Sequence, residues 1–114
     1  MTQKNRVNIT DVGGELVKDT DVYTLRDNTT LNGMVVSSTV LKPKQQTNGH
    51  SHPGIEEVYY FTAGMGYMDL DDEKIVVEAG DIVLIQDGVF HKVYNESIYE
   101  TLDFVCVFNG KRNH

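Results

Sequence analysis

The chain has 114 residues, a formal net charge of −7, 39% hydrophobic residues and 24% charged residues. This length suits one domain with a single layered core, and the composition is that of a folded protein. No run of about 18 apolar residues occurs, so we expect no membrane span. The Lys and Arg residues are scattered along an acidic chain, which argues against nucleic-acid binding.

Two features of the sequence bear on the cellular compartment of the protein. The segment 1–10 has no apolar stretch of the kind found in signal peptides. Cys106 is the single cysteine and cannot form a disulfide within the chain, and free thiols are the rule inside cells. We therefore expect a cytoplasmic protein.

Short runs rich in Val, Ile, Tyr, Phe and Thr alternate with Gly, Asp and Asn along the whole chain, which predicts an all-β protein. In chain order we expect strands at 7–10, 21–26, 33–41, 50–52, 57–62, 66–70, 73–77, 82–85, 91–94 and 100–108. The pair Asp71-Asp72 separates two of these strands at hairpin spacing. About ten short strands at this spacing are typical of a sandwich or a barrel.

A group of histidines suggests a metal site. His50 and His52 alternate in an extended segment and therefore share a face. Pro53-Gly54 then turns the chain into the strand that begins with Glu57, and a later hairpin could return His91 to the same cavity. A single strand histidine is more often only hydrogen-bonded, but three of the four histidines here lie next to Gly or Pro turns. Imidazoles with a carboxylate suit Zn, Fe, Mn, Ni or Co.

The strand after this turn predicts part of a cavity wall. Glu57, Tyr59 and Phe61 share one face, so Tyr59 and Phe61 point inward if Glu57 does. Tyr59 is our candidate catalytic residue, as a hydrogen-bond donor or general acid or base; the alternative is an aromatic that only fills the barrel. The earlier strand turns inward either Met34, Val36, Ser38 and Val40 or the residues of the opposite register.

The spacing of these residues resembles the first motif of the cupin superfamily, G-(x)5-H-x-H-(x)3–4-E-(x)6-G. His50, His52, Glu57 and Gly64 fit it, while Lys44 stands at the position of the first glycine. The six-residue distance to Gly64 selects Glu57, rather than its neighbour, as the ligand.

The second cupin motif, G-(x)5-P-x-G-(x)2-H-(x)3-N, is matched by Gly80, Gly88, His91 and Asn95, with Gln86 in place of the proline. The resemblance implies a cupin-type double-stranded β-helix, or jelly-roll barrel. It implies a single cupin domain over 1–114, with the barrel at about 30–108 and an N-terminal strand or arm at 1–25. It also implies one divalent metal ion, Zn, Mn, Fe or Ni, held by His50, His52, Glu57 and His91.

The C-terminal strand gives a further resemblance. Small cupins that open unsaturated uronates carry an Asp-x-Phe-(x)3-Arg pattern there, and this chain has Cys106, Phe108 and Arg112 at those positions. We place Phe61, Phe108 and Arg112 in the substrate pocket. Cys106 is expected to be a small buried residue, or, if it faces the cavity, to affect ligand choice.

The resulting hypothesis is a metal-binding enzyme that acts on a small oxygen-rich molecule, as an isomerase or lyase of a sugar or sugar acid. The alternatives are an Fe(II)-dependent dioxygenase and a non-catalytic small-ligand-binding protein. We also expect a homodimer, because an open barrel has edge strands to protect, and the strand near residues 7–9 is the segment most suited to exchange between copies.

Overall fold

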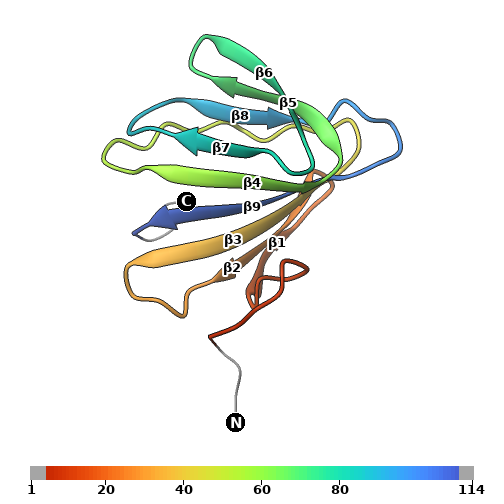
Figure 1. Cartoon of the computed structure of the whole chain (residues 1–114). Helices are drawn as coiled ribbons and strands as arrows, with labels where there is room; N and C mark the ends of the chain where they lie inside the picture. Colours follow the sequence, from red (N-terminus) through yellow and green to blue (C-terminus); the bar gives the residue numbers. More distant parts are fainter. Residues whose placement is uncertain (1–4, 111–114) are drawn as a thin grey trace.

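The computed structural model describes residues 5–110, which form strands, turns and loops (Figure 1). No helix long and apolar enough to cross a membrane occurs among these residues. The strands are β1 (Glu15–Asp19), β2 (Tyr23–Asn28), β3 (Met34–Leu41), β4 (Glu57–Ala63), β5 (Met65–Leu70), β6 (Glu73–Glu78), β7 (Ile82–Ile85), β8 (His91–Tyr94) and β9 (Leu102–Asn109).

The strands form two antiparallel sheets around one apolar core. The larger sheet has the order β1-β2-β3-β9-β4-β7 and the smaller one the order β6-β5-β8. Both sheets contribute to the core: Phe61 and Leu41 come from the first, and Met68 and Val93 from the second. All four side chains are 1% exposed or less. The all-β jelly-roll prediction is therefore confirmed.

Alternation along β4 follows the predicted parity. Glu57, Tyr59 and Phe61 are buried, whereas Val58 and Tyr60 are 38% and 40% exposed on the outer face. On β3 the residues that point inward are those of the opposite register, rather than Met34, Val36, Ser38 and Val40. The inward members are Val35, Ser37, Thr39 and Leu41, all buried.

Two of the predicted strands are wrong. Residues 7–10 form no strand and lead into a turn: the carbonyl of Asn8 accepts a hydrogen bond from the amide of Val12, and the Asn8 side chain accepts one from the amide of Thr10. Short polar side chains of this kind compete with strand pairing. Residues 50–52 form only an isolated bridge between His50 and His91.

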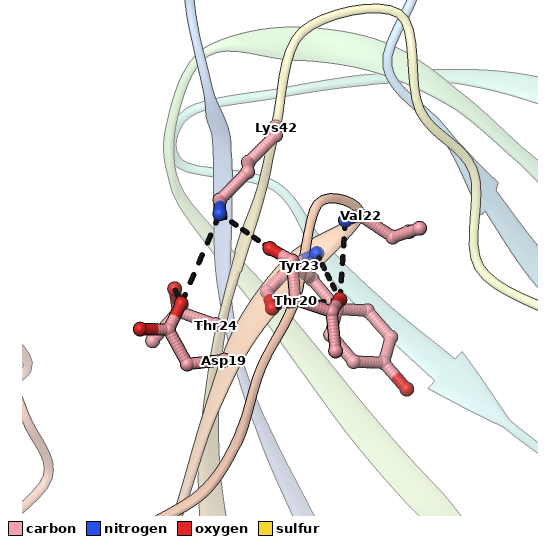
Figure 2. A network of polar contacts seen from close by, with 6 residues as sticks. All are labelled: Asp19, Thr20, Val22, Tyr23, Thr24 and Lys42. Carbon is pink, nitrogen blue, oxygen red and sulfur yellow. Dashed lines mark hydrogen bonds and ion pairs between the residues drawn. The ribbon is translucent and has the colours of Figure 1, made fainter.

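The bounds of the edge strand β1 were not predicted, although β1 lies within the N-terminal strand or arm expected at 1–25. All five of its residues are exposed, so no buried alternation marks it in the sequence. The turn after β1 is held to the end of β3 by Lys42, whose ammonium contacts the carbonyl of Thr20 and lies 3.8 Å from Asp19 (Figure 2). The Thr20 hydroxyl accepts hydrogen bonds from the amides of Val22 and Tyr23. These contacts fix the end of β1 to the end of β3 within the larger sheet.

Candidate metal centre

Two segments far apart in sequence are joined at the site. The amide of His50 donates to the carbonyl of His91 at 3.0 Å, and the amide of His91 donates back to the carbonyl of His50 at 2.9 Å. Beside them, the Ser51 hydroxyl donates to the carbonyl of Gly88 at 2.8 Å. This pairing brings the later histidine to the earlier two. The expected hairpin does not form, because β7 pairs with β4 in one sheet and β8 pairs with β5 in the other.

The ligand atoms of His52, Glu57 and His91 all lie within 4.8 Å of one another. The Nε2 of His91 is 3.6 Å from Oε1 of Glu57. Two ligands that are each about 2.1 Å from one ion lie about 3–4.2 Å apart, so this pair suits a shared ion. The His50 ring lies beside the group, with its centroid 5.3 Å from that of His52 and 6.3 Å from that of His91.

The orientation of His91 is set by the backbone. Its Nδ1 lies 3.0 Å from the carbonyl oxygen of Val89. A carbonyl only accepts, so Nδ1 carries the proton, and the lone pair of Nε2 is directed to Glu57. A second hydrogen bond of this kind is the usual way in which a protein fixes a metal-binding imidazole.

These residues line a cavity of about 290 Å³ on the inner face of the larger sheet. Tyr59 and Phe108, both predicted site residues, line it, and so does Cys106. The Tyr59 ring meets the edge of His91 at a centroid distance of 5.6 Å and stacks on Phe104 at 5.3 Å. Of the two expectations for Cys106, burial and a position facing the cavity, the structure thus shows both.

The other predicted pocket residues are Phe61 and Arg112. Phe61 is fully buried, with its ring centroid 6.3 Å from that of Tyr59, and is not among the described residues that line the cavity. It packs in the core instead. Arg112 lies outside the described residues.

Several cavity residues were not named from the sequence. They are Lys18, Tyr23, Leu25, Ser37, Thr39, Thr47, Asn48, Ile55 and Phe104. Ser37 and Thr39 are members of the inward register on β3, so their strand parity was the available signal. Lys18 lies on β1, whose bounds were not predicted, and its sequence context gave no signal.

The outer face of the smaller sheet carries a separate polar cluster. The hydroxyl of Tyr94 donates to Oδ2 of Asp69 at 2.6 Å. This hydrogen bond, followed by desolvation and the negative charge of Asp69, raises the pKa of Tyr94 above its ordinary value. The ammonium of Lys74 lies 4.1 Å from the centroid of the Tyr94 ring. The cluster is on the face of β8 opposite to the cavity.

Residues 37–108 match the Cupin_2 family, described as the cupin domain. The chain belongs to this cupin family. Both motif histidine segments lie within the matched region, and so do the described lining residues of the cavity except Lys18, Tyr23 and Leu25. Members of the family often bind a metal, and the His-His-Glu group found here fits one in its donor types and spacing.

One similar protein is the uncharacterised protein MJ1618 of Methanocaldococcus jannaschii, 44% identical over 46 residues, which are 40% of this chain and 37% of that protein. Another is protein SchB of Streptomyces halstedii, 38% identical over 56 residues, which are 49% of this chain and 41% of SchB. The matched segment thus spans well under half of the length of these curated relatives.

Solved structures show the same fold. A double-stranded β-helix protein of Klebsiella pneumoniae superposes with a TM-score of 0.77 at 19% identity, covering 91% of this chain and 88% of that one. KdgF from Halomonas sp. gives a TM-score of 0.74 at 13% identity, with 86% and 89% covered.

Proposed function

We propose that this cupin is a divalent-metal-dependent enzyme that acts on a small oxygen-rich molecule, as an isomerase or lyase of a sugar or sugar acid. The observation that carries the proposal is the convergence of His52, Glu57 and His91, with His50 beside them, on the wall of a cavity. The cavity supports a substrate site, because a structural zinc site is closed off by protein, whereas this group of residues opens onto a space that can hold a further ligand. Its volume suits a small molecule.

In this proposal the four residues hold the ion, and the ion supplies Lewis-acid polarisation of a substrate carbonyl or hydroxyl. Tyr59 holds or moves a proton through its hydroxyl, because it is 8% exposed and lines the same cavity as Glu57 and His91. The aromatic rings of Phe104 and Phe108 line the cavity and exclude water from it.

The metal content of the protein, purified without added metal, tests the proposal. We expect about one equivalent of a divalent ion by elemental analysis, without oxygen consumption when sugars and sugar acids are added. Iron together with oxygen uptake would instead support the dioxygenase, which the same donor set suits. A ligand that binds without any turnover would support the non-catalytic binding protein.

Two variants identify the ligands. His52→Ala removes one member of the ligand group and is expected to lower metal affinity at least about 100-fold, more than the loss of residues that only support ligands. Glu56→Ala is the matched control, because Glu56 is exposed while Glu57 is buried, and it should leave metal content unchanged. If both variants lost metal to the same extent, the metal would be bound by residues other than those proposed.

We also propose that the chain is a homodimer. The predicted exchange of residues 7–9 is not supported, because these residues form no edge strand. The outer face of the larger sheet is better suited to the contact, since it exposes several large apolar side chains.

A further inference from the structure

Lys18 is the one Lys or Arg among the described residues that line the cavity. Its place in the sheet explains why it faces inward. Lys18 pairs with Leu25, Leu25 with Thr39, and Thr39 with Phe104. Side chains that lie opposite each other on neighbouring strands share a face of the sheet, and the last three all line the cavity.

The position of Lys18 is held by its neighbours in sequence. A register shift between Leu16 and Lys18 sets the pairing of Lys18 with Leu25. Immediately after it, Asp19 and Thr20 are both engaged by Lys42 (Figure 2). Asp19 is therefore occupied by another lysine, and within residues 5–110 no carboxylate lies within ion-pair distance of the Lys18 ammonium.

The charge of the cavity differs from that of the whole molecule. Glu57 is the single carboxylate among the described lining residues, although the chain as a whole has a net charge of −7. With a divalent ion bound, the ion and Lys18 outweigh Glu57 by two positive charges. The other polar lining residues, such as Thr47 and Asn48, are neutral. Such a cavity attracts an anion and repels a cation.

We infer that Lys18 is a specificity-determining residue that binds the carboxylate of an anionic substrate, so that the cavity takes a sugar acid in preference to a neutral sugar. The inference rests on the proposed function and narrows its substrate class. One end of the ligand lies at the metal centre, and its carboxylate accepts a hydrogen bond from the ammonium at the rim, where Lys18 is exposed. A charge-assisted hydrogen bond of this kind is stronger than one between neutral groups.

The test compares D-galacturonate with D-galactose, which differ in a carboxylate against a hydroxymethyl group. Binding to the metal-loaded protein is measured by calorimetry at low ionic strength. We expect the wild type to bind galacturonate at least about tenfold more tightly than galactose. Lys18→Met should weaken galacturonate binding about five- to tenfold and leave galactose binding within about twofold. Lys18→Arg should retain most of the wild-type affinity for galacturonate, because arginine keeps the positive charge.

Lys74→Met is the matched control, because Lys74 lies on the outer face of the smaller sheet against Tyr94. It should leave both affinities unchanged. Added salt should weaken galacturonate binding by the wild type more than by Lys18→Met, since a rim charge is screened. The inference would be overturned if the wild type did not bind galacturonate. It would also be overturned if Lys18→Met lost affinity for the two sugars equally. Failure of the metal-centre proposal is seen separately, as absence of metal in elemental analysis.

Discussion

At the scale of single residues, the site depends on which face of β4 each of two adjacent glutamates occupies. Glu56 and Glu57 are adjacent, and the strand sends the first to solvent and the second to the cavity. The same alternation carries Tyr59 inward and Tyr60 outward. The motif asparagine, Asn95, binds backbone instead, since its Nδ2 donates to the carbonyls of Leu41, Lys42 and Glu100. It ties the end of β3 to the segment that precedes β9.

The adjacent tyrosines of β4 provide a test of catalysis. Tyr59→Phe removes only a hydroxyl, and we expect turnover to fall about 100-fold or more if that hydroxyl transfers a proton, with metal content intact. Tyr60→Phe makes the same change on the outer face and should leave turnover unchanged. Steady-state assays on a substrate that the wild type converts, together with elemental analysis, measure both effects. Undiminished turnover in Tyr59→Phe would make Tyr59 a packing residue.

At the scale of elements, the sequence predicted those strands in which buried and exposed residues alternate. It failed for strands that lack this alternation. β7 and β8 have the predicted bounds, since each lies between clear turns. The bounds of β1, within the strand or arm expected at 1–25, were missed because its five residues are all exposed and it is held by pairing with β2. The metal group was predictable because motif spacing and strand parity agree on Glu57. Lys18 was not, because only the register of β1 against β2 brings it to the cavity.

One turn departs from the cupin motif in sequence but not in conformation. Lys44 stands where the motif has glycine, and its φ is 63°. A side chain in this left-handed region costs about 1–2 kcal/mol, while glycine adds about 0.4–1 kcal/mol of unfolded-state entropy. Lys44→Gly should therefore raise the free energy of unfolding by about 0.5–1 kcal/mol, measured by urea denaturation.

The control at this position is Lys44→Ala, which removes the long side chain but keeps a Cβ. The amide of residue 44 donates to the carbonyl of Ser97 at 2.9 Å, and both variants retain it. Alanine should give no comparable gain in stability. A gain of equal size in both variants would show that the lysine side chain, and not its backbone conformation, is unfavourable.

At the scale of the whole molecule, the two faces of the larger sheet differ sharply. The inner face holds the core and the cavity. On the outer face, Val58 pairs with Leu84 and Val107, and Tyr60 pairs with Ile82, so apolar side chains are contiguous across β7, β4 and β9. Ile82 and Leu84 are 62% and 71% exposed. A contiguous apolar surface of this kind is typical of an interaction site.

A second copy of the chain is the occupant that we expect on this face. Two flat apolar sheet faces pack against each other as in a β-sandwich, and a two-fold axis lets the same face serve both copies. Because the net charge of −7 opposes close approach of two copies elsewhere, the apolar residues on β7, β4 and β9 are the favourable place for contact. Light scattering at micromolar concentration should give twice the chain mass of 12.8 kDa.

Charges on the outer face should separate this dimer. The double variant Ile82→Lys with Leu84→Lys places four lysines in the contact of two copies, and we expect it to be monomeric while it keeps its metal, because both side chains point away from the cavity. Val76→Lys is the matched control, since Val76 is 53% exposed on the smaller sheet, and it should remain dimeric. A wild type that scatters as a 12.8 kDa particle, or a double variant that stays dimeric, would rule out this face as the contact between copies.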